Sequence, residues 1–308
     1  MTKLLLYLLL FVNLSSYGQT DSIYVDDLYR KYVVHLPLGY DGSTELPVVL
    51  GFHGGFGNAE QFEEQSLLSE KADEANFIVV YPDGLGFLIA PNLHFWNAGV
   101  CCGYPYINDV DDVNFIRNLI DQLAIDFAVD EDRVYATGIS NGAFMSYRLA
   151  CELSDKIAAI APVAGGMIVE DCPSDRQVPI IHFHSYLDEN IPYNGGYGDG
   201  PSSHYNPPLD SVFNVWSTIG NCGIEEDTLY HDLDYTLVSW RNCDCGSEIN
   251  YYISTDGGHS WPGGTSPPLG DPVSSVLNAN DLMWNFFQEH DINCGPSIIE
   301  TNDKPIFG

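Results

Sequence analysis

One serine in this chain has the sequence context of a catalytic nucleophile. Ser140 is the centre of Gly138-Ile-Ser-Asn-Gly142, which follows an expected strand and opens an expected helix. Glycines on both sides permit the strained strand-to-helix turn that exposes a serine hydroxyl, because a side chain at either position would crowd it. The alternative is an ordinary turn between a strand and a helix. We interpret Ser140 as a nucleophile, which requires a base and an acid.

A carboxylate and an imidazole follow two later strands in the order that this chemistry needs. Asp188 comes just after one expected strand, and His259 lies in a glycine-rich loop after another. We expect both at the carboxyl edge of a parallel sheet, where such proteins hold their sites. The order Ser140, Asp188, His259 is the one that α/β-hydrolases use. Glu189, next to Asp188, is the alternative acid.

Backbone N–H groups that could hold an oxyanion are expected at two places. The expected strand Pro47–Phe52 runs into His53-Gly-Gly-Phe-Gly, which is similar to the glycine-rich loop that donates one N–H group in esterases. We assign this donor to Gly55, with Phe56 as the alternative. The second donor is the residue after the nucleophile, Asn141. We expect the ring of His53 to hold the loop by hydrogen bonds.

Aromatic residues near these motifs are candidates for substrate binding. An aromatic wall suits a phenolic acyl group or the face of a sugar. The alternative is that they only pack at the rim of the site. The candidates are Phe56, Trp96, Tyr186 and Trp261.

Two groups of residues could instead bind metal. His182 and His184 alternate on one expected strand and share a face, but no third ligand accompanies them. Asp109, Asp111 and Asp112 could bind calcium, although a helix N-terminus that favours negative charge explains them more simply. We predict no metal and no cofactor.

The charge of the chain excludes several partners. Its 308 residues include 43 acidic and 11 basic ones, for a formal net charge of −32. A nucleic-acid binder needs a basic footprint, and an anionic membrane surface would repel this chain. Hydrophobic residues make up 45% of the chain, enough for a globular core. Among substrates, this charge favours a neutral one over a polyanion, and we expect a monomer.

The N-terminus and the cysteines indicate an exported protein. Leu4–Val12 is almost entirely apolar and leads into small and polar residues, so we interpret residues 1–18 as a signal peptide. An N-terminal anchor or a buried helix is the alternative. We expect a single catalytic domain at 19–296 and a tail or linker at 297–308. Eight cysteines in an exported chain predict disulfides, with their pairing open, over a metal site.

The hydrophobic pattern predicts an α/β fold with a mostly parallel sheet flanked by helices. Helices are expected at Asp112–Phe127, Asn141–Leu153 and near the C-terminus. Two loops, 86–109 and 194–208, are expected to cross the edge of the sheet and shape a site. Strands are expected at Tyr32–Leu36, Pro47–Phe52, Phe77–Tyr81, Val134–Gly138, Ala158–Val163, Val178–Phe183 and Ile249–Ile253.

Taken together, the motifs resemble a family of secreted esterases. This family groups polyhydroxybutyrate depolymerase-like proteins with the feruloyl and acetylxylan esterases of carbohydrate esterase family 1. The resemblance implies an α/β-hydrolase fold and a triad of Ser140, Asp188 and His259. The family often has His-Gly-Thr before its acid, where this chain has His184-Ser-Tyr-Leu. The matching stretches are His53-Gly-Gly, Tyr81-Pro-Asp-Gly, Trp96-Asn-Ala-Gly, Cys101-Cys-Gly, Val110-Asp-Asp-Val, Arg133-Val-Tyr-Ala-Thr-Gly-Ile-Ser-Asn-Gly-Ala and Gly257-Gly-His-Ser-Trp-Pro-Gly.

The sequence therefore predicts a secreted serine carboxylic ester hydrolase. Plant cell-wall esters, feruloyl or acetyl groups on xylan, are the first expectation for its substrate. The alternative is depolymerisation of polyhydroxybutyrate or a similar aliphatic polyester. A non-catalytic carbohydrate-binding scaffold is the third hypothesis.

Overall fold

The computed structural model describes residues 18–293, apart from 91, 175, 201–203, 224–225 and 267–269, and apart from the side chains of 226–229. Most of the expected signal peptide at 1–18, the whole expected tail at 297–308 and Cys294 therefore lie outside the described residues.

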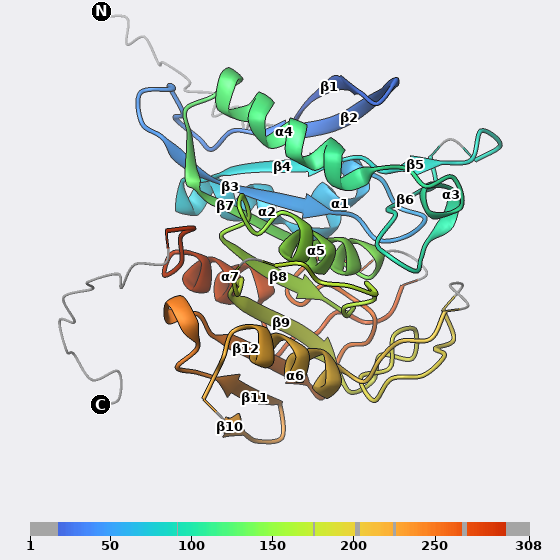
Figure 1. Ribbon diagram of the computed structural model, residues 1–308, viewed down its shortest axis with the longest axis vertical. Coiled ribbons are helices and arrows are strands. Elements are labelled where there is room, and N and C mark those ends of the chain that lie inside the picture. The colour runs from blue at the N-terminus through green and yellow to red at the C-terminus, as the bar shows by residue number, and fades with distance from the viewer. Residues whose placement is uncertain are drawn as a thin grey trace, which may run out of the picture.

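A ten-stranded sheet runs through the molecule in the order β1-β2-β4-β3-β7-β8-β9-β12-β11-β10 (Figure 1). Strands β4, β3, β7, β8, β9 and β12 are parallel to one another, and an antiparallel pair of strands extends the sheet at each end. The strands are β1 (Gln19–Val25), β2 (Leu28–His35), β3 (Leu46–Phe52), β4 (Ile78–Pro82), β7 (Val129–Ile139), β8 (Ala159–Val163), β9 (Ile180–Ser185), β10 (Glu226–His231), β11 (Tyr235–Trp240) and β12 (Ile249–Ser254).

Helices cover both faces of this sheet. In Figure 1, α4 (Asp112–Asp126), α5 (Asn141–Glu152) and α6 (Leu209–Ile219) lie in front, and α1 (Ala59–Ser66), α2 (Leu68–Ala75) and α7 (Ala279–Phe287) lie behind. A short hairpin and a helix lie on the side of the sheet where the parallel strands end (Figure 1). They are the hairpin of β5 (Leu85–Gly86) and β6 (His94–Phe95) and the helix α3 (Gly103–Ile107).

Alternation along the central strands builds the two halves of the core. On β3, Val48 and Leu50 belong to the cluster that includes Phe115 of α4, whereas Val49 belongs to the cluster that includes Phe62 of α1. All five side chains are at most 1% exposed. Because every residue of β3 is buried, its sequence is apolar without a polar face, as expected for a parallel strand covered on both sides.

The expected fold class is confirmed, and the structure adds elements that the sequence pattern did not predict. Each of the seven expected strands is present, with its ends shifted by up to five residues. The edge strands β1 and β10 were not expected, and neither were β11 and α6. The helix α6 nevertheless has a clear signal, because Leu209, Val212, Phe213 and Trp216 recur at helical spacing and are all buried.

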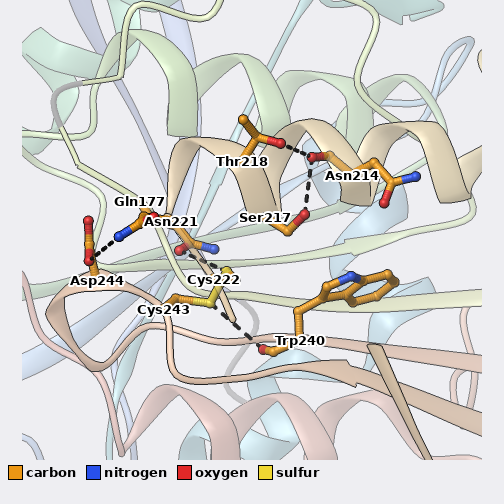
Figure 2. The surroundings of a disulfide bond; sticks show 9 residues. All are labelled: Gln177, Asn214, Ser217, Thr218, Asn221, Cys222, Trp240, Cys243 and Asp244. Atoms are coloured by element: carbon orange, nitrogen blue, oxygen red, sulfur yellow. Dashed lines mark hydrogen bonds between the residues drawn. A yellow bond between two sulfur atoms is a disulfide. The ribbon is translucent and has the colours of Figure 1, made fainter. Parts of the chain in front are cut away.

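The expected disulfides are present among the described cysteines, none of which is free. They join Cys101 to Cys102, Cys151 to Cys172 and Cys222 to Cys243. Figure 2 shows the last of these, which ties the end of α6 to the segment after β11. The disulfide thereby fixes a helix on the front face to the outer, antiparallel part of the sheet.

A buried ion pair fixes α4 to the antiparallel edge. Arg30 of β2 donates to the Asp112 carboxylate at 2.6 Å, and the two side chains are 2% and 0% exposed. Its guanidinium also lies 4.0 Å from the centre of the Phe115 ring. The second oxygen of Asp112 accepts the Asn97 N–H at 2.7 Å. Asp111 caps α4 by accepting the Asn114 N–H at 2.9 Å, so two of the three candidate calcium ligands serve the helix N-terminus.

Removing one member of this pair should destabilise the fold severely. Arg30→Met leaves the Asp112 carboxylate buried without its partner, and we expect the free energy of unfolding to fall by about 3–5 kcal/mol. The matched control is Arg117→Met, because the Arg117–Asp155 pair is exposed and should contribute at most about 1 kcal/mol. Urea unfolding of both variants checks the difference, and equal losses would contradict this reading of Arg30.

Candidate active site

The loop at Ser140 has the strained geometry that its sequence predicts. Ser140 lies between β7 and α5 with φ 58° and ψ −118°, a conformation that costs free energy for a residue with a side chain. A Cβ atom on Gly138 would lie 2.6 Å from the Phe52 carbonyl oxygen, and one on Gly142 would collide with the same atom. Both glycines are therefore required where β3 passes the turn.

Asp188 and His259 come together at the carboxyl ends of neighbouring parallel strands. Asp188 follows β9, His259 follows β12, and these two strands pair directly. The distance from His259 Nδ1 to Asp188 Oδ2 is 2.9 Å. The other carboxylate oxygen accepts the N–H groups of Asn190 at 3.0 Å and Ile191 at 2.8 Å. Glu189, the alternative acid, is exposed, so the geometry favours Asp188 as the partner of His259.

The environment keeps Asp188 ionised. Burial alone would raise the pKa of this carboxyl, which is only 4% exposed. The neighbouring imidazole of His259 and the hydrogen bonds to the carboxylate outweigh burial, so the pKa of Asp188 lies below its ordinary value. An ionised Asp188 can only accept a proton, so Nδ1 of His259 is the donor and Nε2 is left as the basic atom of the ring.

Hydrogen bonds of His53 and Phe56 hold the glycine loop after β3 in place. His53 Nε2 accepts the Gly84 N–H at 3.0 Å, which places the ring proton on Nδ1, from where it is donated to the Gly54 carbonyl at 2.7 Å. The Phe56 N–H donates to the His94 carbonyl at 2.9 Å and is thus engaged. Among the two loop donors expected for an oxyanion, this arrangement favours Gly55.

Asn141 connects the turn at Ser140 to the same loop. Its side chain accepts the Trp96 N–H at 2.8 Å and donates to the Trp96 carbonyl at 3.1 Å. The Trp96 indole N–H in turn donates to the His53 carbonyl at 3.1 Å. As the first residue of α5, Asn141 has a backbone N–H with no acceptor inside the helix. The N–H groups of Gly55 and Asn141 both belong to residues that line the cavity at Ser140.

Two adjoining hollows meet at Ser140 and His259. The first, which we call the apolar hollow, has a volume of about 410 Å³. The second, the polar hollow, has a volume of about 370 Å³. The apolar hollow is lined by Phe56, Phe87, Phe95, Cys102 and Phe144 among others. The polar hollow is lined by Asn58, Gln61, Gln65 and Asp271 among others. Ser140 and His259 thus lie between an apolar hollow and a hollow lined by hydrogen-bonding side chains.

Three of the four aromatic candidates lie away from these hollows. Phe56 lines both of them. Trp96 and Trp261 are fully buried. Burial leaves no polar group unsatisfied there, since their indole N–H groups donate to the His53 carbonyl and to Asn280. Tyr186 is 39% exposed and packs edge-on against Tyr193, outside the lining of either hollow. The expectation that these three residues form the wall is therefore corrected.

The other residues that form the apolar wall beside Phe56 were not predicted from the sequence. Phe87, Phe95 and Cys102 all lie in the loop 86–109, which was expected to shape a site. Phe144 follows Ser140 on the first turn of α5. For Phe87, Phe95 and Cys102, the signal in the sequence was their position in a loop expected at the edge of the sheet. Residue type alone could not distinguish Phe87 and Phe95 from aromatic residues that are buried.

His182 and His184 form a buried hydrogen-bonded chain rather than an open ligand pair. The Tyr147 hydroxyl bonds His182 Nδ1 at 2.9 Å, His182 Nε2 bonds His184 Nδ1 at 3.2 Å, and His184 Nε2 donates to the Ile191 carbonyl at 2.7 Å. Burial lowers the pKa of both imidazoles, so both are neutral. All four ring nitrogens thus have protein partners.

Two other sets of side chains have the spacing of metal ligands. His53, Asp83 and His94 bring ligand atoms within 4.8 Å of one another, but hydrogen bonds already engage them: His53 accepts the Gly84 N–H, and His94 Nδ1 lies 2.7 Å from Asp83. Cys101, Cys102 and His204 form the second set, in which the two sulfur atoms are joined in a disulfide. The hydrogen bonds and the disulfide account for both sets.

Within the described part of the chain, no helix has the length and apolarity needed to cross a membrane.

Sequence comparisons connect this chain to esterases. Residues 30–178 match the family described as esterase PHB depolymerase. Feruloyl esterase B of Piromyces equi is 31% identical over 243 residues, which are 75% of this chain and 42% of that protein. The chain thus spans less than half of that relative. The probable feruloyl esterase C of Aspergillus clavatus is 29% identical over 260 residues, which are 84% of this chain and 83% of that one.

Solved structures share the fold at low sequence identity. An acetyl xylan esterase from Aspergillus awamori has a TM-score of 0.61 at 13% identity, over 88% of this chain and 99% of that one. A ferulic acid esterase of carbohydrate esterase family 1 from Anaeromyces mucronatus has a TM-score of 0.51 at 16% identity, over 90% and 92%. The solved structures show that the chain has the α/β-hydrolase fold, and in sequence the chain is similar to carboxylesterases, feruloyl and acetylxylan esterases among them.

Proposed function

We propose that this protein hydrolyses carboxylic esters of the plant cell wall, feruloyl or acetyl groups on xylan, with Ser140 as nucleophile. The observation that carries the proposal is the hydrogen bond between a buried, ionised Asp188 and His259, which lines the same cavity as Ser140. The names of the relatives support the same chemistry, since several are feruloyl esterases.

The mechanism follows from the positions of these groups. His259 takes the proton of the Ser140 hydroxyl as the oxygen attacks the ester carbonyl, and Asp188 holds the imidazole in the correct tautomer and stabilises its charged form. The N–H groups of Gly55 and Asn141 receive the oxyanion, and one such donor typically contributes about 3 kcal/mol. The alcohol leaves with the proton from His259, and water then resolves the acyl-enzyme by the same steps.

The two hollows suggest which half of the substrate lies on which side. The apolar hollow suits an aryl acyl group, because its walls are aromatic. The polar hollow offers amide and carboxylate groups to sugar hydroxyls on the alcohol side. This division favours a feruloyl ester of a polysaccharide over an aliphatic polyester, whose two halves are equally apolar. Three disulfides and the expected signal peptide support export of the enzyme.

Replacing the nucleophile should abolish the reaction. We expect Ser140→Ala to lower kcat/KM for methyl ferulate by about 10⁴-fold or more, because the remaining groups can polarise the ester but cannot form the acyl-enzyme. Ser211→Ala, at an exposed position on α6, is the matched control and should retain full activity. A serine-directed phosphonate should label the control and not Ser140→Ala. Hydrolysis that survives in Ser140→Ala would refute the mechanism.

A panel of three substrates tests the assignment of the hollows. We expect turnover of methyl ferulate and acetylated xylan and much slower release of monomer from polyhydroxybutyrate. Measured initial rates at equal ester concentration give the ranking. Turnover of the polyester alone would overturn the cell-wall assignment in favour of depolymerisation, and no turnover of any ester would favour the non-catalytic scaffold.

The loop that supports the oxyanion should make the protein sensitive to acid. Burial lowers the pKa of His53 to about 4, against about 6.5 in an unfolded chain. Between pH 4 and pH 6.5 the imidazole of His53 is protonated in the unfolded chain and neutral in the folded one. The contribution of His53 to the free energy of unfolding is therefore complete above about pH 6.5 and is lost as the pH falls toward about 4. The loss from His53 is about 3 kcal/mol, since one pKa unit corresponds to about 1.4 kcal/mol.

His53→Gln should therefore flatten this pH dependence. We expect the difference in free energy of unfolding between pH 7 and pH 4 to shrink by about 3 kcal/mol in that variant, as measured by urea unfolding at each pH. His231→Gln, at an exposed position of β10, is the matched control and should change the difference far less. The same pH dependence in His53→Gln as in the unaltered protein would show that His53 is not its source.

A further inference from the structure

Residues 84–108 differ from the rest of the chain in charge. They contain no Asp, Glu, Lys or Arg, although 18% of all residues in the chain are charged. In the structure this uncharged segment includes β5, β6, the turn between them and α3 (Figure 1). Several of its residues line the apolar hollow at Ser140. A protein with a net charge of −32 thus has a neutral region beside its candidate active site.

The turn between β5 and β6 carries an exposed apolar surface, which we call the apolar tip: Phe87, Leu88, Ile89 and Leu93. Leu88 is 98% exposed and Ile89 is 95% exposed. Single exposed apolar side chains are ordinary on a protein surface. Adjacent, fully exposed aliphatic side chains at the end of a hairpin leave an apolar area that gains free energy when another surface covers it.

The apolar tip is continuous with the apolar hollow. Phe87 belongs to both, and its ring packs edge-on against Tyr104 of α3 with ring centres 5.6 Å apart. Phe56 and Phe95, which also line the hollow, form a second edge-on pair at 4.6 Å. A substrate whose ester lies at Ser140 and which extends outward past Phe87 reaches the tip.

We propose that the apolar tip docks on an uncharged, aromatic-rich polymer of the plant cell wall, to which the acyl group of the hydrolysed ester is attached. The proposal rests on the proposed function, because it takes the ester to be a cell-wall ester. The absence of charge in residues 84–108 provides no attraction for a polyanion or a polycation. Leu and Ile side chains offer no hydrogen bonds to sugar hydroxyls, so the tip does not suit a polysaccharide chain. The aromatic pairs that lead from hollow to tip favour aromatic rings.

A matched pair of substitutions tests this surface. Leu88→Asp places a charge on the tip, and Leu233→Asp places the same charge on the turn between β10 and β11, where Leu233 is 92% exposed. Leu88→Ser removes the apolar side chain without adding a charge. The measurements are adsorption to particles of synthetic lignin made from coniferyl alcohol, and hydrolysis of soluble methyl ferulate.

We expect the unaltered protein and Leu233→Asp to adsorb equally, Leu88→Asp to adsorb about tenfold more weakly, and Leu88→Ser to lie between them. All variants should hydrolyse methyl ferulate at the same rate, because neither Leu88 nor Leu233 lines the hollows at Ser140. Equal adsorption of Leu88→Asp and Leu233→Asp would overturn the proposal.

Three further outcomes would also overturn it by identifying another occupant. Stronger adsorption to insoluble xylan would assign the tip to polysaccharide, and stronger adsorption to a polyhydroxybutyrate film would assign it to aliphatic polyester. A dimer on gel filtration that Leu88→Asp dissociates would assign it to a second copy of this chain. Ser140→Ala separates this proposal from the proposed function, because that variant should lose hydrolysis and keep its adsorption to lignin.

Discussion

The close approach of β3 to the turn at Ser140 is the constraint on which the rest of the site depends. The strained backbone of Ser140 persists because its N–H donates to the Val163 carbonyl at 3.0 Å and because Gly138 and Gly142 let the turn pass the Phe52 carbonyl. Strands β3, β7 and β8 must therefore be neighbours in this order. The same adjacency brings the glycine loop after β3 next to the first turn of α5, where the oxyanion donors are proposed.

A second set of contacts links the turn at Ser140 to elements farther from the site. Asn141 binds the backbone of Trp96 on both sides, and the next residue, Asn97, donates to Asp112, which is paired with Arg30. The nucleophile turn, the uncharged loop, α4 and the antiparallel edge of the sheet are thus joined by buried hydrogen bonds. Buried polar networks of this kind are costly when a member is lost, so the site is positioned by groups far from its chemistry.

The sequence predicted the parts of the site that depend on the backbone. Glycine is required where a Cβ would collide, and the ends of parallel strands share an edge, so Ser140, Asp188 and His259 could be assigned to one edge from local pattern and order alone. The central strands were predictable because burial on both faces leaves them apolar throughout. Their pairing order could not be read from pattern, because it depends on contacts between distant segments.

The aromatic residues show where such reasoning ends. Trp96 and Trp261 stand within the matching motifs, yet both are buried, because each indole N–H has an acceptor inside the protein. Phe87 and Phe95 looked no different in type and form the wall of the hollow. Which face an aromatic ring presents is decided by the loop conformation around it. The edge strands were missed for a related reason, since β1 is mostly exposed and gives only a weak hydrophobic signal.

The two outermost strands, β1 and β10, have a consequence for how copies of this molecule meet. The free edge of a sheet presents unpaired N–H and C=O groups that can recruit another chain into an aggregate. Among the described residues, no further strand pairs with β1 or β10, and both edges are acidic: β1 carries Asp21 and ends at the turn with Asp26 and Asp27, and β10 ends at the turn with Asp232 and Asp234. Two such edges repel each other when they approach, so the acidic composition keeps a long open sheet from growing into a fibre.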